Sequence, residues 1–372
     1  MGKQTSFGSW EEWMGQPLRL LVATWDGAGN LPPILALVNR LVHRGHAVHV
    51  LAHDVQKDRI EAAGGTFLGF DTTAQIDHGR SQPLGANPLA SLLELDRDAT
   101  NDLLAACDRL GPDALLVDCM LPGTLSAAKR TGRPTVALVH ALYGAFIGFA
   151  GGAFRGPIDE SDLALGFTYS ALDDAASARP NLVFVGPARP PAPATHWARR
   201  RPERPLVMAS LSTGLQGKPG TQLALLQRVC DGLATLDIEA LITTGRGIAP
   251  EELIAGPSTT LHRFVPHEVV LAQANLLITH AGHGSVTAAL AAGVPMLCMP
   301  PGGDQPFNAA RVAQLGLGVT LDPAAPSDHI GEAVTRLLAD EDLRRRSQAF
   351  ATLVSRHPGL DLAVERVETL RS

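Results

Sequence analysis

The sequence predicts an α/β protein built from two domains that each contain a parallel sheet. Short apolar segments typical of buried strands alternate with amphipathic segments typical of helices along the chain. A stretch rich in proline and arginine, residues 188–205, interrupts this alternation, and such a stretch cannot continue a sheet. The pattern then restarts at Leu206, so we expect two copies of one α/β plan joined by a linker.

The first domain is predicted at residues 17–187. It begins with a strand at 18–24 and a helix at 33–44, which Gly45 ends. The other elements predicted here are strands at 47–52, 114–117, 135–139 and 182–185 and a helix at 121–131. Residues 1–16 lack the basic start and apolar run of a secretion signal, and we expect a poorly ordered leader.

The second domain is predicted at residues 206–355. Its strands are expected at 206–210, 240–243, 261–264, 276–279 and 296–299. Residues 328–350 have a helical pattern, and residues 356–372 are expected to form a C-terminal helix. Ligands of parallel sheets lie beyond the carboxyl ends of the strands, so two facing sheets would enclose a cleft between the domains.

Composition excludes several classes of partner. The net charge of −6 argues against nucleic acid or an anionic membrane surface, and we expect neither. The four cysteines show no CxxC spacing, which favours a reducing cytoplasm and gives no metal-binding signature. The longest apolar stretch, residues 141–154, is interrupted by glycines and falls short of the ~18 residues that a membrane-spanning helix needs.

The most informative segment follows the predicted strand 276–279. It reads His280-Ala-Gly-His-Gly-Ser285 and leads into a helix that Gly293 ends. A glycine-rich turn at a helix start presents backbone N–H groups and the positive end of the helix dipole, which together bind anions. The next strand ends before Asp304 and Gln305, which would emerge at the same sheet edge and bind sugar hydroxyls. A nucleotide sugar fits this layout.

These residues closely resemble the family 1 glycosyltransferases of the GT-B fold, especially bacterial enzymes that decorate natural products. The resemblance is carried by segments 264–267 and 280–285, Gly293-Val-Pro295, Asp304-Gln305, Asn308 and segment 315–318, and more weakly by segment 29–46, Asp118 and segment 185–187. It implies two Rossmann-like domains whose parallel sheets face each other across a cleft. It also implies a C-terminal helix that packs back on the N-terminal domain.

The resemblance also implies a donor site. His280 would hydrogen-bond the α-phosphate of the donor, and Gly282, Gly284 and Ser285 would meet the pyrophosphate at the helix start. Phe264 would stack on the nucleotide base, and the Val265 backbone would read the edge of the base. Asp304 and Gln305 would hold sugar hydroxyls, and Ser212 and Thr213 would line the phosphate path.

Two positions depart from the family pattern. A glutamate that binds the ribose hydroxyls is frequent in the family where this chain has Ala288, and its loss favours a deoxynucleotide donor such as a dTDP-sugar. The catalytic histidine of the family is replaced by Asn30, whose amide cannot serve as a general base. Asp118, which orients that histidine in the family, or Asp26 would then take the proton.

A carboxylate with a reference pKa of ~3.9 is a feeble base toward an alcohol, so we expect an acceptor that ionises readily, such as a phenol. His140, Tyr143 and Phe146 are predicted to line an apolar acceptor pocket.

Several of these residues also have a purely structural interpretation. Asp118 and Asn30 would be helix caps, Phe264 a core residue, His53 a solvated loop residue and the Asp96-Arg97-Asp98 segment a solvated helix face.

The function predicted first is an inverting, metal-independent glycosyltransferase with no cofactor. It would transfer a sugar from a dTDP or UDP donor to a hydrophobic natural product, through oxygen. Transfer to carbon, a non-catalytic auxiliary protein motivated by Asn30, and a nucleotide-sugar epimerase are the alternatives. The expected partners are these small molecules, and a homodimer is compatible with the sequence.

Overall fold

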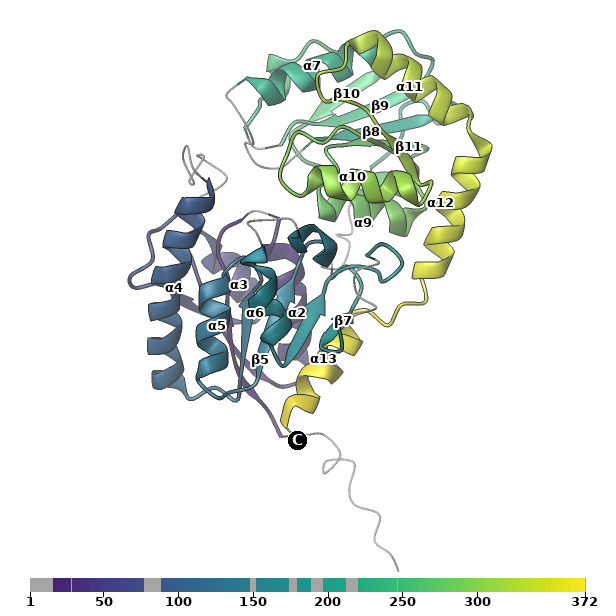
Figure 1. Cartoon of the computed structure of the whole chain (residues 1–372). Coiled ribbons are helices and arrows are strands. Elements are labelled where there is room, and N and C mark those ends of the chain that lie inside the picture. Colours follow the sequence, from purple (N-terminus) through teal and green to yellow (C-terminus); the bar gives the residue numbers. More distant parts are fainter. Residues whose placement is uncertain are drawn as a thin grey trace, which may run out of the picture.

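Two lobes, each with a parallel sheet between layers of helices, make up the molecule (Figure 1). This computed structural model describes residues 16–27, 29–76, 88–147, 152–173, 179–188, 197–211, 220–245 and 247–371. The predicted α/β class with two parallel sheets is therefore confirmed. None of the helices in these residues is both long enough and apolar enough to cross a bilayer.

The first lobe contains a 7-stranded parallel sheet in the order β3-β2-β1-β4-β5-β6-β7. Its strands are β1 (Arg19–Ala23), β2 (Ala47–Ala52), β3 (Thr66–Gly69), β4 (Ala114–Asp118), β5 (Thr135–Val139), β6 (Leu163–Gly166) and β7 (Leu182–Phe184). Its helices are α2 (Leu31–His43), η1 (Asp54–Gln56), α3 (Lys57–Ala62), α4 (Pro88–Leu110), α5 (Pro122–Arg130), η2 (Tyr143–Ile147) and α6 (Arg155–Glu160). The strand order reverses between β1 and β4, which makes their carboxyl ends the topological switch point where ligands of such sheets bind.

Helices cover both faces of this sheet, so its central strands are apolar throughout. In β4, Leu115 and Val117 pack into one apolar cluster with α4 and α5, whereas Ala114 and Leu116 pack into another with α2. The polar Asp118 ends the strand at the edge of the sheet, where it is nevertheless fully buried. Burial of a carboxylate at this point requires partners, which the site described below supplies.

Two aspartates of the long helix α4 hydrogen-bond to two loops at the carboxyl edge of the sheet. Asp96 is buried, and its carboxylate accepts hydrogen bonds from the backbone N–H groups of Gly123 and Thr124 at the start of α5. Asp102 likewise accepts hydrogen bonds from the backbone N–H groups of Thr72 and Thr73. The interpretation of the Asp96 segment as a solvated face is therefore wrong for Asp96, which stabilises the first turn of α5.

The second lobe contains a 6-stranded parallel sheet in the order β10-β9-β8-β11-β12-β13. Its strands are β8 (Leu206–Ser210), β9 (Glu239–Thr243), β10 (Thr259–His262), β11 (Leu276–Thr279), β12 (Met296–Cys298) and β13 (Gly318–Thr320). Its helices are α7 (Thr221–Leu233), η5 (Pro250–Glu252), α8 (His267–Leu271), α9 (His283–Ala292), α10 (Gln305–Gln314), α11 (Ser327–Ala339) and α12 (Glu341–Val354). Here the switch point lies between β8 and β11.

The helix predicted at 328–350 is in fact two helices. Asp340 separates α11 from α12 with an extended backbone, and its Oδ1 accepts a hydrogen bond from the Leu343 N–H at 2.8 Å. This is an N-cap in the middle of a continuous helical pattern. The break lets α12 leave the second lobe and run toward the first (Figure 1).

The last helices, α13 (Leu360–Glu368) and η6 (Thr369–Arg371), return to the first lobe, as the resemblance implies. Ala363, Val364 and Val367 of α13 are buried in the apolar cluster that contains α2. Ion pairs from Arg40 to Asp361 and from Arg44 to Glu368 flank this contact. The C-terminal segment thus ties both lobes together.

The lobes also meet directly near their sheet edges. Leu142, which follows β5, and Leu172, which follows β6, pack in one apolar cluster with Val265 and Ala281 of the second lobe. The Arg311 Nε–H donates a hydrogen bond of 2.8 Å to the Leu172 carbonyl oxygen. These contacts bring the carboxyl end of β5 close to the segment that contains His280.

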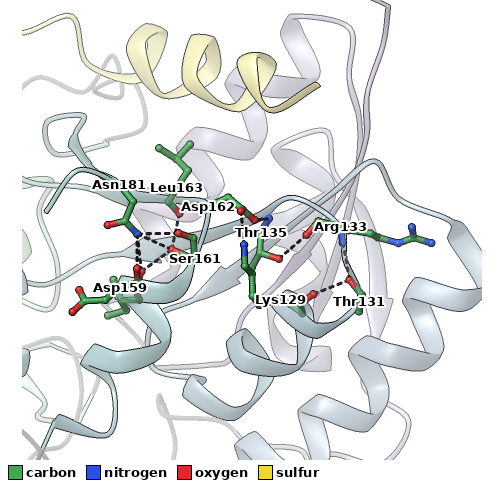
Figure 2. A network of polar contacts seen from close by, with 11 residues as sticks. Lys129, Thr131, Arg133, Thr135, Asp159, Ser161, Asp162, Leu163 and Asn181 are labelled. Carbon is green, nitrogen blue, oxygen red and sulfur yellow. Dashed lines mark hydrogen bonds and ion pairs between the residues drawn. The ribbon is translucent and has the colours of Figure 1, made fainter. Parts of the chain in front are cut away.

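Polar contacts hold the opposite, amino edge of β5 and β6 (Figure 2). The Asp162 carboxylate accepts a hydrogen bond from the Thr135 N–H at 2.9 Å and pairs with Lys129. Asn181 donates to the Ser161 carbonyl oxygen at 3.0 Å. Because both strands are fixed at their amino ends, the positions of their carboxyl ends are fixed as well.

Candidate active site

The predicted phosphate-binding turn lies at the carboxyl edge of the second sheet. β11 ends at Thr279, and residues 280–282 turn the chain directly into α9, whose N-cap is Gly282. Gly284, which is exposed, and Ser285, which is half-buried, belong to the first turn of this helix. The predicted phosphate-binding residues thus form one continuous turn at the positive end of a helix dipole.

The ring of His280 lies against the backbone of this turn. A Cβ atom at position 282 would lie 2.3 Å from Nε2 of His280, so a larger residue there would force the ring or the turn to shift. The other ring nitrogen, Nδ1, lies 3.5 Å from the carbonyl oxygen of Ser210, which ends the neighbouring strand β8. His280 therefore occupies the switch point of the second sheet.

Burial lowers the pKa of His280 to about 4, although the Ser210 carbonyl acts in the opposite direction and the charge of His267 adds a smaller lowering. The imidazole is consequently uncharged at neutral pH. It is a polar group that can hydrogen-bond a ligand without carrying a fixed positive charge of its own.

The turn is held in a strained conformation by Asn308. Ala281 has φ of 63°, the one positive φ of a non-glycine residue among the described residues. The Asn308 side-chain amide donates to the Ala281 carbonyl oxygen at 3.0 Å and to Oδ2 of Asp304 at 2.9 Å. Asn308 thereby connects the His280 turn to Asp304, one of the two residues predicted to bind the sugar.

Asp304 and Gln305 lie at the start of α10, beyond the end of β12. Asp304 is half-buried, and Gln305 is only 3% exposed. Oε1 of Gln305 accepts a hydrogen bond from the Gly302 N–H at 3.3 Å, so this side chain also orders its own loop. Their contact with sugar hydroxyls stays a prediction.

Phe264 is 68% exposed on the segment between β10 and α8, so its interpretation as a core residue is wrong. An exposed aromatic ring at a sheet edge is available to stack on a base. Val265 is buried in the cluster that contains Ala281. The predicted Ser212 and Thr213 lie outside the described residues.

The carboxyl edge of the first sheet carries Asp118, held by four described groups. Its Oδ2 accepts hydrogen bonds from Asn30 Nδ2 at 2.7 Å and from the Thr24 hydroxyl at 3.0 Å. Its Oδ1 accepts them from the Met120 N–H at 2.9 Å and from His140 Nε2 at 2.8 Å. These bonds occupy the roughly four lone-pair positions of a carboxylate, so Asp118 has little capacity left for a substrate.

The helix-cap interpretation is wrong for Asp118, and it holds for Asn30 only in position, because Asn30 makes no side-chain cap hydrogen bond. Leu121 is the N-cap of α5, and Asp118 lies before it. Asn30 is the N-cap residue of α2, but its side chain turns away from the helix, and its Nδ2 also donates to the Trp25 carbonyl oxygen at 2.9 Å. Asn30 therefore anchors the buried carboxylate.

His140 follows β5, directly beside the end of β4, and pairs with Asp118. Burial alone would lower the pKa of His140, but Asp118 and Cys119 together outweigh burial, and the pKa lies well above its usual value. In the same way, burial opposes ionisation of Asp118, yet His140 and Asn30 keep the pKa of this carboxyl below its usual value. The pair is therefore an ion pair when His140 holds its second proton.

Potential ligand atoms of Asp118, Cys119 and His140 lie within 4.8 Å of one another. A cation there would need carboxylate lone pairs that Thr24, Asn30 and the Met120 N–H already engage. The hydrogen bonds of Asp118 therefore fit a carboxylate that orients the imidazole of His140 better than they fit a metal ligand.

The chain is similar in sequence and fold to known glycosyltransferases. The family described as "Erythromycin biosynthesis protein CIII-like, C-terminal domain" matches residues 227–370. A zeaxanthin glucosyltransferase of Pseudescherichia vulneris is 36% identical over 47% of this chain and 42% of its own length. The chain thus spans less than half of that relative. An NDP-glycosyltransferase of Bacillus subtilis is 25% identical over 91% of this chain and 94% of its own length.

Among solved structures, a calicheamicin glycosyltransferase superimposes with a TM-score of 0.79 over 95% of this chain and 98% of that chain, at 24% identity. The chain is thus similar to bacterial glycosyltransferases, several of which act on natural products. Its fold is GT-B, with the two switch points described above at the sheet edges of the two lobes.

The predicted acceptor residues have different surroundings. Tyr143 and Phe146 are 2% and 4% exposed and belong to the core of the first lobe. The Tyr143 hydroxyl bonds Asp159, and the Phe146 ring stacks on Phe154. Their burial favours a structural role, and their contact with an acceptor stays a prediction.

Asp26 is 9% exposed, and its backbone N–H donates to Nδ1 of His53 at 3.1 Å. Nε2 of His53 lies 3.1 Å from the Ala74 carbonyl oxygen, so the ring bridges two loops. His53 is fully buried, and its interpretation as a solvated loop residue is wrong. The role of Asp26 as a base stays a prediction.

Sequence reasoning placed His140 at the acceptor and missed its pairing with Asp118. A signal was present, because both residues end predicted strands that are neighbours along the chain. Parallel neighbours bring their carboxyl ends together, which puts the imidazole beside the carboxylate.

Proposed function

We propose that the protein transfers a sugar from a nucleotide diphosphate to a hydrophobic small molecule, with inversion at the anomeric carbon and without a metal ion. The observation that carries the proposal is the His280 turn at the switch point of the second sheet. A helix start, a glycine that admits close approach, and a buried neutral imidazole converge there. This combination suits a diphosphate that leaves with added negative charge.

The remaining donor contacts follow from neighbouring positions. Phe264 would stack on the base, with the Val265 backbone at the edge of the base, and Asp304 and Gln305 would bind sugar hydroxyls. Gly282, Gly284 and Ser285 would contact the pyrophosphate, and Ser212 and Thr213 would line its path. Asn308 supports this assignment because it links Asp304 to the phosphate turn.

A deoxynucleotide donor is favoured. Ala288 is 3% exposed within an apolar cluster, so this position offers no carboxylate to a ribose 2′-hydroxyl. A structural neighbour of the same fold was solved in complex with dTDP. We therefore propose dTDP-sugars ahead of UDP-sugars.

The acceptor is proposed to be a natural product with an ionisable hydroxyl, phenolic or polyketide in character, glycosylated through oxygen. Relatives include a demethyllactenocin mycarosyltransferase and an oleandomycin glycosyltransferase. Transfer to the carbon of an electron-rich ring is the alternative for the same site.

A non-catalytic auxiliary protein is the second candidate, and the presence of Asn30 instead of a histidine motivates it. Such a protein would bind nucleotide but transfer nothing. Mass spectrometry of purified protein with dTDP- and UDP-sugars and a panel of phenols separates the candidates. A glycosylated product supports the enzyme, whereas binding without product or donor hydrolysis contradicts it.

The donor site itself is tested with His280→Ala and a matched control, His329→Ala, on the exposed surface of α11. In thermal-shift titrations, dTDP at ~100 times its Kd should stabilise the native protein by ~2.7 kcal/mol. Loss of a hydrogen bond to a charged group, worth ~1.5–3 kcal/mol, should weaken dTDP binding by roughly 10- to 150-fold in His280→Ala only. Unchanged affinity would contradict the proposed site.

A further inference from the structure

We propose that His140, oriented by Asp118, is the general base that removes the proton from the acceptor. This inference rests on the proposed glycosyl transfer and assigns a group that the reaction needs and that Asn30 cannot provide. It differs from both bases expected from the sequence, Asp26 and Asp118.

The hydrogen bonds around Asp118 indicate that the carboxylate orients His140 and that the imidazole acts as the base. Nε2 of His140 faces Oδ1 of the carboxylate at 2.8 Å, so this nitrogen carries the proton of the pair and Nδ1 is left as the basic nitrogen. Asn30 and Thr24 hold the other carboxylate oxygen at 2.7 and 3.0 Å. A carboxylate fixed in this way orients an imidazole and stabilises its protonated form.

The location of His140 suits contact with an acceptor close to the donor. It lies at the carboxyl end of β5, next to the switch point between β1 and β4. Leu142, two positions further on, packs in the same apolar cluster as Ala281 of the donor turn. The side chain of His140 keeps 12% exposure, whereas that of Asp118 is fully buried.

The other candidates fit less well. The oxygens of Asp118 are engaged by four donors, so it would have to release one of them to accept a proton. The thiol of Cys119 also faces the imidazole, but Cys119 is fully buried and cannot reach a substrate as a nucleophile. Asp118 and Cys119 are the titratable groups whose charges influence His140.

The proposed glycosyl transfer needs no reactant other than the acceptor and the donor. The acceptor O–H bond breaks, and its proton moves to Nδ1 of His140. The electron pair left on the acceptor oxygen forms the bond to the anomeric carbon of the donor. The bond from that carbon to the β-phosphate oxygen breaks, and its electron pair leaves with the nucleoside diphosphate near the start of α9.

The electrostatics predict the direction of the pH dependence. Because Asp118 and Cys119 raise the pKa of His140 well above its usual value against the effect of burial, this imidazole stays protonated to a higher pH than an ordinary histidine. A base must be unprotonated, so kcat/KM should rise with pH through the pKa of His140 and level off above it.

The test compares His140→Gln with His43→Gln, a matched change of an exposed histidine on α2. General-base catalysis contributes typically ~100- to 10,000-fold, so kcat of His140→Gln should fall by that factor while the Kd of dTDP is unchanged. The rise of kcat/KM with pH should disappear in His140→Gln and persist in His43→Gln. Wild-type kcat with an intact pH profile in His140→Gln would overturn the proposal.

Two further measurements separate a chemical role from a structural one. Across phenols of graded acidity, the loss in His140→Gln should be largest for weakly acidic phenols and should shrink toward phenols that are already ionised. In the double variant Asn30→His/His140→Gln, the new imidazole would face the other oxygen of Asp118 and should regain at least tenfold of the lost rate. A uniform loss for all phenols together with no regain would assign His140 to structure.

These outcomes are distinct from failure of the proposed function. If wild-type protein binds dTDP yet transfers sugar to no acceptor and releases none to water, the glycosyltransferase proposal fails. If wild-type protein transfers sugar and His140→Gln does so equally well, the transferase stands and only the base assignment is overturned.

Discussion

Each lobe places a histidine at the carboxyl edge of its parallel sheet, and the two imidazoles have opposite electrostatics. In the first lobe, Asp118 pairs with His140 and raises its pKa well above the usual value. In the second lobe, burial lowers the pKa of His280 to about 4, and its nearest described polar partner is the Ser210 carbonyl. The same side chain is thus adapted to different tasks by what lies behind it.

The difference shows that position in the fold does not by itself assign a role. A carboxylate behind an imidazole raises its pKa, whereas burial lowers the pKa of His280 against the opposite effect of the Ser210 carbonyl. The neighbouring residue of interest is Asp118 in the first lobe, and in the second it is Gly282, whose backbone lies against the His280 ring. The predictions that follow alter these neighbours.

The largest effect is expected for Asp118→Asn, which removes the charge but keeps the shape of the side chain. His140 would lose its orienting carboxylate, so kcat should fall by ~100-fold or more. Without that charge, burial would dominate and the pKa of His140 would drop, so the remaining activity should level off at a lower pH than in the wild type. A pH profile of kcat/KM measures both effects, and an unshifted profile would argue against the pairing.

The second prediction concerns Gly282→Ala. The added Cβ would lie 2.3 Å from Nε2 of His280, which forces the ring or the turn to move. We expect dTDP affinity to fall by about tenfold or more, since a displaced ring loses a hydrogen bond of ~1.5–3 kcal/mol to a charged group. Isothermal titration against Gly156→Ala, where an added Cβ meets nothing within 4 Å, isolates the steric effect. Equal affinities in the two variants would contradict the described geometry.

A third prediction follows from the low pKa of His280. A bound diphosphate should raise this pKa above its free value of about 4, so binding takes up a proton between the two values. dTDP affinity should therefore weaken as pH rises through that window, by at most ~tenfold per unit, and be constant above it. Transfer should show the opposite trend, because His140 must lose its proton. The slope should vanish in His280→Gln, and a slope of opposite sign in the wild type would refute this linkage.

A smaller effect is expected for Asn308→Ala. The change leaves the Ala281 carbonyl without a hydrogen bond in a buried region and releases Asp304. The free energy of unfolding, measured by urea denaturation, should fall by ~1–3 kcal/mol. If Asp304 contacts the sugar, the variant should also lose more affinity for an intact dTDP-sugar than for dTDP. A loss that is identical for both ligands would show that Asp304 does not contact the sugar.

The smallest effect is expected for Ala281→Gly, which relieves the positive φ of 63°. A left-handed conformation costs a non-glycine residue roughly 1–2 kcal/mol, partly offset by the flexibility of glycine in the unfolded chain. We expect stability to rise by about 1 kcal/mol or less in the same denaturation assay. Lower stability would mean that the turn is not strained in solution.

Much of the fold was predictable because the apolar segments are unusually regular. The central strands, such as β4 and β11, are short runs that helices bury on both faces, and their boundaries follow directly from the sequence. The edge strands β3 and β13 were missed, since half-buried or exposed residues interrupt their pattern. Strand β6 was also missed, although it is fully buried, because it is a run of only 4 residues. The break at Asp340 was missed because a capping aspartate also fits within a helical pattern.

The candidate site divides in the same way. The phosphate turn of the proposed donor half is contiguous in the sequence, so its residues could be found as one motif around His280. The base half is assembled from the ends of β1, β4 and β5, and the pairing of Asp118 with His140 depends on the order of strands in the sheet. The capping interpretation failed for Asp118 and for the side chain of Asn30, because a local pattern cannot reveal a partner 88 residues away.

The most direct test is an NMR pH titration of the histidine ring protons in the free protein, with His140→Gln and His280→Gln used to assign the two signals. The account predicts that the His140 signal titrates well above pH 6.5 and that the His280 signal stays in its neutral position down to about pH 4. If both rings titrate together near their ordinary value, or if their order is reversed, the opposite roles assigned to the two lobes are contradicted.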